Sequence, residues 1–226
     1  APLGISEAIP LSGVFPPIDV TTRPREEFEE LVARIDAAQF HNYVSFEEEP
    51  ELARGEIQRL VQAGFLREYD TLEELEAYVG GHVLLNKLAM IIKPKPGGGV
   101  KLRLITDLLR SRGNEFLIAP ERIVLPRLID ALESVMYLHA AIDSAVAAGN
   151  PGATAEGVEI GSTDVKDAFF NVPVRPEDRR AQCYKAFGKF YVSDSLVFGA
   201  GPSPLVWGRV AAWLARTAQG VFDFRE

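Results

Sequence analysis

The chain has 226 residues, of which 47% are hydrophobic and 25% are charged, and it carries a formal net charge of −8 at pH 7. This composition excludes collagen-like and wholly disordered proteins, and the net negative charge excludes a protein that wraps nucleic acid through overall positive charge. No apolar run approaches the roughly 20 residues needed to cross a bilayer, so we expect no membrane partner. The single cysteine, Cys183, rules out an intramolecular disulfide and fits an intracellular protein of the cytoplasm or nucleus. Because the sequence begins with Ala1 rather than Met, we expect it to be cut from something longer, such as a polyprotein, or to be otherwise processed.

The first third of the chain divides by composition into an arm and a helical region. Residues 1–23 hold four prolines and few charges, which favours an extended arm that is poorly ordered alone. Residues 24–85 have apolar residues at helical spacing. We expect three amphipathic helices in this N-terminal region, the first after Pro24, the second around 50–64 and the third over 71–79, which opens with the pattern of a capping box.

Residues 86–119 predict a basic hairpin. Two stretches with apolar residues at alternate positions flank the glycine-rich segment 93–99. Residues 91–115 contain six basic and two acidic side chains, a local charge of +4 in a chain of −8. Alternation places Lys101 and Arg103 on one face of a strand, where both can contact phosphates of a nucleotide or a template. The alternative is an ordinary exposed hairpin whose lysines keep its edge from pairing.

The remaining region, residues 120–226, predicts an α+β unit. A long helix with apolar periodicity is expected over 122–146, and a loop of small residues over 147–157. The later elements are expected in this order: a strand over 158–163, an extended segment over 171–174, two strands around Gly188-Lys189, and a helix over 204–219.

Two segments of this region could carry chemistry. A carboxylate where a strand ends can bind a divalent cation, with an adjacent backbone carbonyl as a second oxygen ligand, and Asp164 fits this description. The alternative is helix capping, because Asp164 and Asp167 have the three-residue spacing favoured at a helix N-terminus. The second segment is the glycine- and proline-containing turn 198–204, where the backbone can pass close to a planar ligand. Such a turn is also a common loop-to-helix junction.

The order of these features resembles the fingers and palm of reverse transcriptases, particularly those of eukaryotic retroelements. The resemblance runs from Leu88 to Gln219 and covers over half of the chain. It rests on the basic hairpin, the long helix, Asp164-Val165-Lys166-Asp167-Ala168-Phe169-Phe170-Asn171-Val172-Pro173-Val174, the strand pair around Gly188-Lys189, and Phe198-Gly199 with Ser203-Pro204.

The resemblance implies a fold, an activity and partners. The fold would be α+β, with a helical N-terminal region, a fingers hairpin, and an incomplete palm whose antiparallel sheet is backed by helices. The activity would be that of an RNA-directed DNA polymerase, a nucleotidyltransferase of retrotransposon type. It would use Mg²⁺ or Mn²⁺, deoxynucleoside triphosphates, and an RNA or DNA template with its primer.

The resemblance also implies a role for each matching residue. Asp164 would be the first metal-binding aspartate of the palm, with the Val165 carbonyl beside it. Phe169 would be the aromatic gate that excludes a 2′-hydroxyl, while Asp167 and Ala168 line the triphosphate and sugar through their backbone.

Further roles follow from the hairpin and the glycine turn. Arg103 would lie over the incoming nucleotide and contact its phosphates, with a lysine partner supplied by Lys93, Lys95 or Lys101. Gly199 would let template and nucleotide approach the backbone, with Ser203 and Pro204 opening the helix behind it. Phe198 stands where retroviral enzymes have glutamine.

One element of the family pattern is missing from the sequence. The paired aspartates of the next palm hairpin do not occur before Glu226. Nucleotidyl transfer needs two cations, and Asp164 alone cannot hold both, so we expect this fragment to be inactive alone. Two other interpretations remain. One is a non-catalytic nucleic-acid-binding domain derived from a decayed palm, and the other is an acidic interaction domain whose basic hairpin is ordinary surface.

Overall fold

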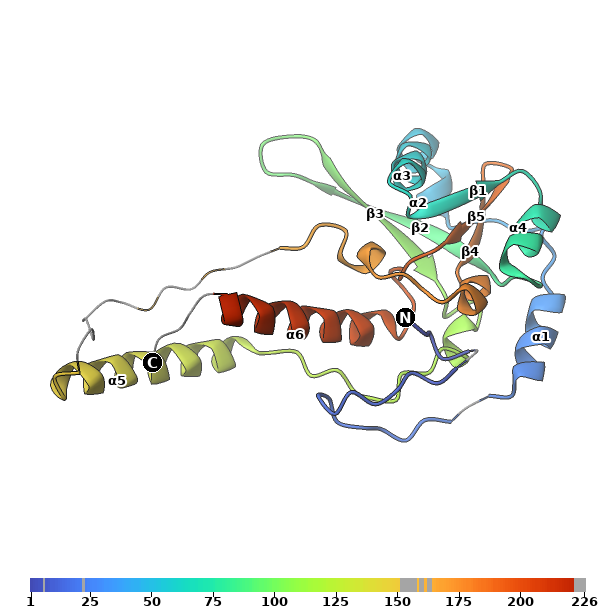
Figure 1. Ribbon diagram of the computed structural model, residues 1–226. Coiled ribbons are helices and arrows are strands. Elements are labelled where there is room, and N and C mark those ends of the chain that lie inside the picture. The colour runs from blue at the N-terminus through green and yellow to red at the C-terminus, as the bar shows by residue number, and fades with distance from the viewer. Residues whose placement is uncertain (6, 22, 151–157, 159–160, 162–163, 222–226) are drawn as a thin grey trace. The chain divides into compact units, whose positions relative to one another are not determined.

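The computed structural model describes residues 1–5, 7–21, 23–150, 158, 161 and 164–221 (Figure 1). The chain divides into two compact units, which are described separately. The sheet unit consists of Ala1–Ile123 and Asp167–Glu226, and the helical unit consists of Val124–Lys166. No helix within the described residues combines the length and the apolar content that a bilayer crossing requires.

The sheet unit is built on one five-stranded sheet with the strand order β1-β5-β4-β2-β3. The strands are β1 (Leu66–Tyr69), β2 (Leu85–Pro94), β3 (Val100–Asp107), β4 (Cys183–Ala186) and β5 (Lys189–Ser193). All neighbours pair antiparallel except β2 and β4, which pair parallel over two residues. The predicted hairpin and the predicted strand pair around Gly188 are therefore confirmed, and the chain is a mixed α+β protein as expected.

Helices flank this sheet and close its core. The α-helices of the sheet unit are α1 (Arg25–Ala33), α2 (Val44–Glu47), α3 (Pro50–Gln62), α4 (Leu72–Val79) and α6 (Ser203–Val221). Three short 3₁₀ helices are η1 (Gly113–Glu115), η2 (Ala168–Asn171) and η3 (Pro176–Ala181). The predicted capping box is present, because Thr71 accepts a hydrogen bond from the Glu74 amide and Glu74 accepts one from the Thr71 amide. Aromatic and aliphatic side chains from these helices, such as Phe28, Phe46 and Leu60, are fully buried against the sheet.

The N-terminal region is not purely helical, contrary to the prediction. Strand β1 lies between α3 and α4 and pairs with β5, with Leu66 opposite Ser193 and Tyr69 opposite Phe190. Four residues carry little periodic signal of their own, and their partner strand comes from the other end of the chain. The pairing makes the N-terminal region part of the same sheet as the C-terminal half.

The N-terminal arm packs against the rest of the sheet unit, whereas the expectation that it is poorly ordered alone concerns the isolated segment and stays a prediction. Leu3 and Ile9 are buried in the main core, and the Leu3 amide donates to Oδ2 of Asp178 at 2.6 Å. Gly4 has a left-handed φ of 96°, and a β-carbon there would lie 2.7 Å from the Ile118 nitrogen. The arm is extended, as its prolines require, but tertiary contacts hold it along the sheet unit (Figure 1).

A buried carboxylate anchors the middle of the arm. Glu121 accepts hydrogen bonds from the Ser12 amide at 2.6 Å, the Ser12 hydroxyl at 2.7 Å and the Gly13 amide at 3.1 Å. Arg209 of α6 donates to the same carboxylate at 2.8 Å. Burial alone would raise the pKa of Glu121, but these hydrogen bonds outweigh it and bring the pKa to about 2. Glu121 thus joins the arm to α6.

The helical unit contains α5 (Leu128–Ala147), which confirms the predicted long helix but begins later than expected. Pro126 explains the delay, because a proline disfavours helical geometry at the residue before it. The predicted loop 147–157 lies mostly outside the described residues. The same holds for the predicted strand 158–163, of which only Val158 and Gly161 are described, and neither belongs to a strand.

Candidate functional site

The turn between β5 and α6 is pressed against the edge strand β3. The Thr106 amide of β3 donates to the Phe198 carbonyl at 3.1 Å. Gly199 has a left-handed φ of 109°, and a β-carbon at this position would lie 1.8 Å from the Thr106 carbonyl oxygen. Only glycine tolerates both the left-handed φ and the missing space for a β-carbon. The glycine at position 199 therefore allows the β3 backbone to approach the turn closely.

Asn114 fixes this turn from the other side. Its Nδ2 donates to the Gly199 carbonyl at 2.9 Å, and its Oδ1 accepts from the Gly201 amide at 2.9 Å. Asn114 was not identified from the sequence. The only available signal was its place just after the basic hairpin, which does not indicate a partner so far along the chain.

The turn before η2 lies beside the glycine turn. Asp167 has a left-handed φ of 51° and leads into Ala168 and Phe169 of η2. The Phe169 and Phe198 rings are 4.8 Å apart between centroids with an interplanar angle of 47°. The structure thus brings Asp167, Ala168 and Phe169, which the resemblance assigns to the nucleotide, next to Phe198 and Gly199 of the glycine turn.

A second aromatic layer supports this contact. Phe170 stacks on Phe65 at 5.1 Å with an interplanar angle of 17°, and it meets Phe198 edge-on at 6.4 Å. Phe170 is buried, whereas Phe169 is half-buried and Phe198 is 37% exposed. Aromatic faces that are supported from below and open to solvent can pack against a sugar or a base.

Arg59 of α3 reaches the η2 turn and was not identified from the sequence. Its guanidinium donates to Oδ2 of Asp167 at 3.2 Å and to Oδ1 at 3.4 Å. It also forms a bidentate pair with Glu56, one helical turn earlier, with both distances at 2.9 Å. Hydrogen bonds to Glu56 and Asp167 raise the pKa of Arg59, so its charge is permanent.

The basic hairpin presents its cations on one face. The register places Lys93 directly opposite Lys101 and Ile91 opposite Arg103, so Lys93, Lys101 and Arg103 share that face. All three are exposed, and in the described part of the chain none of them forms an ion pair. Lys95 lies in the glycine turn, where its amide donates to the Gly99 carbonyl at 3.0 Å. Like charges directly opposite each other repel, so this face favours an anion.

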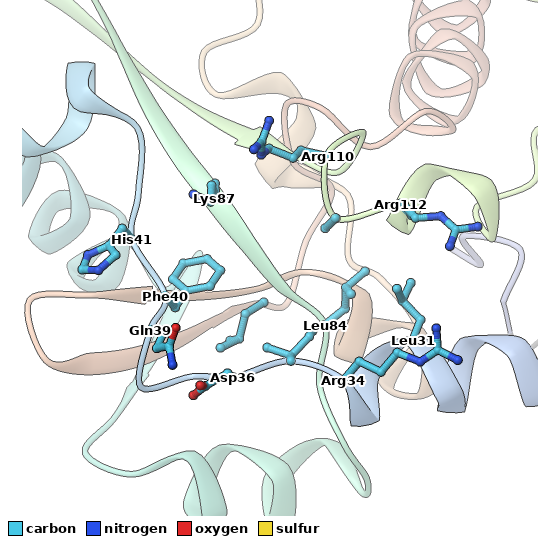
Figure 2. A pocket seen from close by; sticks show the side chains of 13 residues that line it. Leu31, Arg34, Asp36, Gln39, Phe40, His41, Leu84, Lys87, Arg110 and Arg112 are labelled. Carbon is cyan, nitrogen blue, oxygen red and sulfur yellow. The ribbon is translucent and has the colours of Figure 1, made fainter.

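A groove of about 390 Å³ lies near the other end of this hairpin (Figure 2). It is bordered by the loop after α1, the start of β2 and the segment after β3. The charged side chains of the lining are Arg34, Lys87, Arg110, Arg112 and the single acid Asp36, with Phe40 and His41 beside them. Arg34 and Arg112 also pair with Glu30 and Glu115 on their own segments. The excess of positive charge in an acidic chain makes this groove a candidate for phosphate groups.

Asp107 holds the segment that carries Arg110. Its carboxylate accepts the Leu109 amide at 3.0 Å, the Arg110 amide at 2.9 Å and the Tyr43 hydroxyl. Burial alone would raise the pKa of Asp107, but these hydrogen bonds outweigh it and lower the pKa. The hydrogen bond from the Tyr43 hydroxyl to Asp107 raises the pKa of Tyr43. Asp107 therefore stays ionised, and it fixes the chain direction at the rim of the groove.

The predicted metal residues belong to the helical unit. Asp164 and Val165 are both exposed there. No cluster of three or more His, Cys, Asp or Glu side chains able to hold a metal ion occurs among the described residues. Asp164 and the Val165 carbonyl would supply two oxygen ligands, and Mg²⁺ commonly completes its near-octahedral coordination with waters and substrate phosphates.

Ser203 and Pro204 begin α6 as predicted. Ser203 is completely buried, and its hydroxyl finds no hydrogen-bond partner in the described structure. Pro204 is exposed at the first turn, where its missing N–H costs nothing. The burial of Ser203 indicates a structural role at this helix start.

Comparison with family models and with curated proteins gives no match for this chain.

Proposed function

We propose that this chain carries the nucleotide- and nucleic-acid-binding part of a reverse transcriptase, an RNA-directed DNA polymerase. The observation that carries the proposal is the contact between the η2 turn and the glycine turn. The resemblance assigns Asp167, Ala168, Phe169 and Gly199 to the nucleotide, and Phe169 packs ring against ring on Phe198, the residue before Gly199.

The site has features suited to an incoming deoxynucleoside triphosphate. The half-buried Phe169 offers a hydrophobic face to a sugar, and a 2′-hydroxyl against such a face would lose its hydrogen bonds to water. Gly199 lets β3 pack against the turn, since the Thr106 carbonyl occupies the space that a side chain would take, and this contact fixes the backbone beside Phe198. The exposed cations Arg103, Lys93 and Lys101 on the hairpin supply the positive charge that a triphosphate or a template backbone requires.

The groove extends the positive surface toward nucleic acid. Lys87 and Arg110 provide cations at its rim, and Phe40 and His41 provide rings on which unpaired bases can stack. The proposed partner is therefore a primed RNA or DNA template.

In this proposal, Asp164 is the metal-binding carboxylate, with the Val165 carbonyl beside it. Two Mg²⁺ or Mn²⁺ ions would activate the primer 3′-hydroxyl and hold the triphosphate. No group of three or more metal-ligating side chains occurs among the described residues, so Asp164 would need further ligands to hold both ions. We therefore expect these 226 residues to bind template and nucleotide without extending the primer.

A second candidate function is nucleic-acid binding without chemistry, and the solitary Asp164 favours it. The two candidates differ in one property. A polymerase fragment should bind a complementary deoxynucleoside triphosphate more tightly than a mismatched one when Mg²⁺ is present, whereas a decayed palm should not discriminate.

The experiment measures fluorescence anisotropy of a labelled primed template with the purified chain at low salt. We expect salt-sensitive binding that Arg103→Ala weakens and that Lys189→Ala, a matched removal of a cation paired with Glu68, leaves unchanged. Added complementary nucleotide with Mg²⁺ should tighten the complex, and Asp164→Ala should abolish that effect. Binding that is unchanged in Asp164→Ala, with and without nucleotide, would favour the non-catalytic domain. Absence of binding would reject both candidates.

A further inference from the structure

The η2 turn depends on a contact from a different element. Asp167 holds a left-handed φ of 51°, a conformation that costs a non-glycine residue of order 1 kcal/mol or more. Such a conformation persists only where surrounding contacts impose it. Within the described residues, the Arg59 guanidinium donates to the Asp167 side chain, and Nδ2 of Asn171 donates to the Asp167 carbonyl at 3.2 Å.

Arg59 is itself held in position. Its bidentate pair with Glu56, whose side chain is only 11% exposed, directs the guanidinium toward η2. A planar guanidinium can serve two carboxylates at once, which an ammonium group on a flexible stem does less well. The linked ion pairs Glu56–Arg59 and Arg59–Asp167 therefore connect α3 to the η2 turn.

The stabilising value of such an ion pair is small. Partly exposed pairs contribute at most about 1 kcal/mol. The ion pair matters more for the position of Phe169 than for stability. Asp167 immediately precedes the helix that carries Phe169, and the Phe169 ring lies 4.8 Å from that of Phe198. A rotation of the turn would move Phe169 relative to the glycine turn.

We infer that Arg59 is a positioning residue for the nucleotide site: its pair with Asp167 fixes the η2 turn so that Phe169 faces Phe198 and selects the sugar. The inference rests on the proposed function for its nucleotide role. Arg59 touches no reacting group in this scheme and acts only through Asp167.

The first test measures hydrogen–deuterium exchange in the purified chain and needs no ligand. Arg59→Ala should speed exchange of the Val172 amide, which donates to the Phe169 carbonyl at 3.0 Å, by about two- to fivefold. Arg59→Lys should give an intermediate exchange rate, because lysine keeps the positive charge but lacks the planar guanidinium that pairs with two carboxylates at once. Arg54→Ala is the matched control on the same helix, since Arg54 lies over the Phe187 ring and does not reach Asp167.

The second test measures the ratio of dissociation constants for dGTP and GTP on the chain with primed template and Mg²⁺. We expect Arg59→Ala to reduce the preference for dGTP by about tenfold, with partial recovery in Arg59→Lys and no change in Arg54→Ala. A residue that only stabilised the fold would change urea unfolding without changing this ratio.

The outcomes separate the two proposals. Unchanged exchange at Val172 in Arg59→Ala would overturn the inference directly. Faster exchange with an unchanged dGTP preference would overturn the nucleotide role of Arg59 and leave the proposed function intact. If the wild-type chain shows no preference between dGTP and GTP, the proposed function fails, and the nucleotide role of Arg59 fails with it.

Discussion

Two glycine-containing turns in the sheet unit have similar compositions and opposite physical roles. Gly97, Gly98 and Gly99 at the hairpin tip all have left-handed φ angles, and a β-carbon at any of them would meet nothing within 4 Å. Gly199 has a similar φ, but its β-carbon would collide with the Thr106 carbonyl. The hairpin tip uses glycine to reverse the chain, and the turn at Gly199 uses it to admit a neighbouring strand.

The comparison shows why the two turns suit different tasks. The tip has free space and exposed cations around it, so it can adapt to a bound anion. The Gly199 turn is held by Thr106 and Asn114, so it can offer a preformed surface. Preformed surfaces lose less entropy on binding than mobile ones.

The largest expected change in the free energy of unfolding comes from replacing Gly199, and replacing Gly98 of the hairpin tip provides the comparison. Gly199→Ala should destabilise the fold by at least about 3 kcal/mol, because the methyl group would overlap Thr106 and the left-handed φ would be strained. Gly98→Ala should cost only about 1 kcal/mol, from the backbone conformation alone. Urea unfolding measures both, and equal losses in the two variants would contradict the comparison.

The next effect concerns the anchor of α6, the helix that follows the Gly199 turn. Glu121→Gln should destabilise by about 2 kcal/mol, because it leaves Arg209 without its buried charged partner. The pKa of Glu121 is about 2 in the folded state and ordinary in the unfolded state. Its stabilisation is therefore present above about pH 4.5 and is lost as the pH falls toward 2. Urea unfolding from pH 7 to pH 2 should show a smaller decrease for the variant than for the wild type.

A smaller effect is expected where Asn114 holds the glycine turn. Asn114→Ala removes two hydrogen bonds at a half-buried position and should destabilise by about 1 kcal/mol. It should also speed amide exchange at Gly201, whose N–H donates to Asn114, while leaving exchange at Lys95 in the hairpin turn unchanged. Equal acceleration in both turns would mean that Asn114 acts on the whole sheet and not on this turn.

The smallest effect on stability is expected at the hairpin. Lys101→Ala removes one of two facing lysines and should change the free energy of unfolding by less than about 0.5 kcal/mol. It should nevertheless lower the slope of log K against log salt for primed template by about 1. A stability loss comparable to that of Gly199→Ala, or an unchanged slope, would show that the hairpin is structural and not a binding element.

The prediction of individual elements succeeded where the signal is local. The capping box at Thr71 and the alternation around the hairpin turn each depend on residues that lie close together in sequence, and both are confirmed. The start of α5 was predicted too early, although the Pro126 signal was available. The assignment of Asp164 to a metal site stays a prediction, as do the roles assigned to the hairpin cations.

The sequence by itself determined which residues could meet the demands of a site: glycine at position 199, aromatic rings at 169 and 198, and a run of cations in the hairpin. Only the tertiary structure decided that Arg59 pairs with Asp167, that β1 pairs with β5, and that the proline-rich arm is held by Glu121. Local patterns act over a few residues, through backbone geometry and side-chain spacing. These three contacts join distant segments, and they form only when burial of the shared core offsets the entropy of closing long loops.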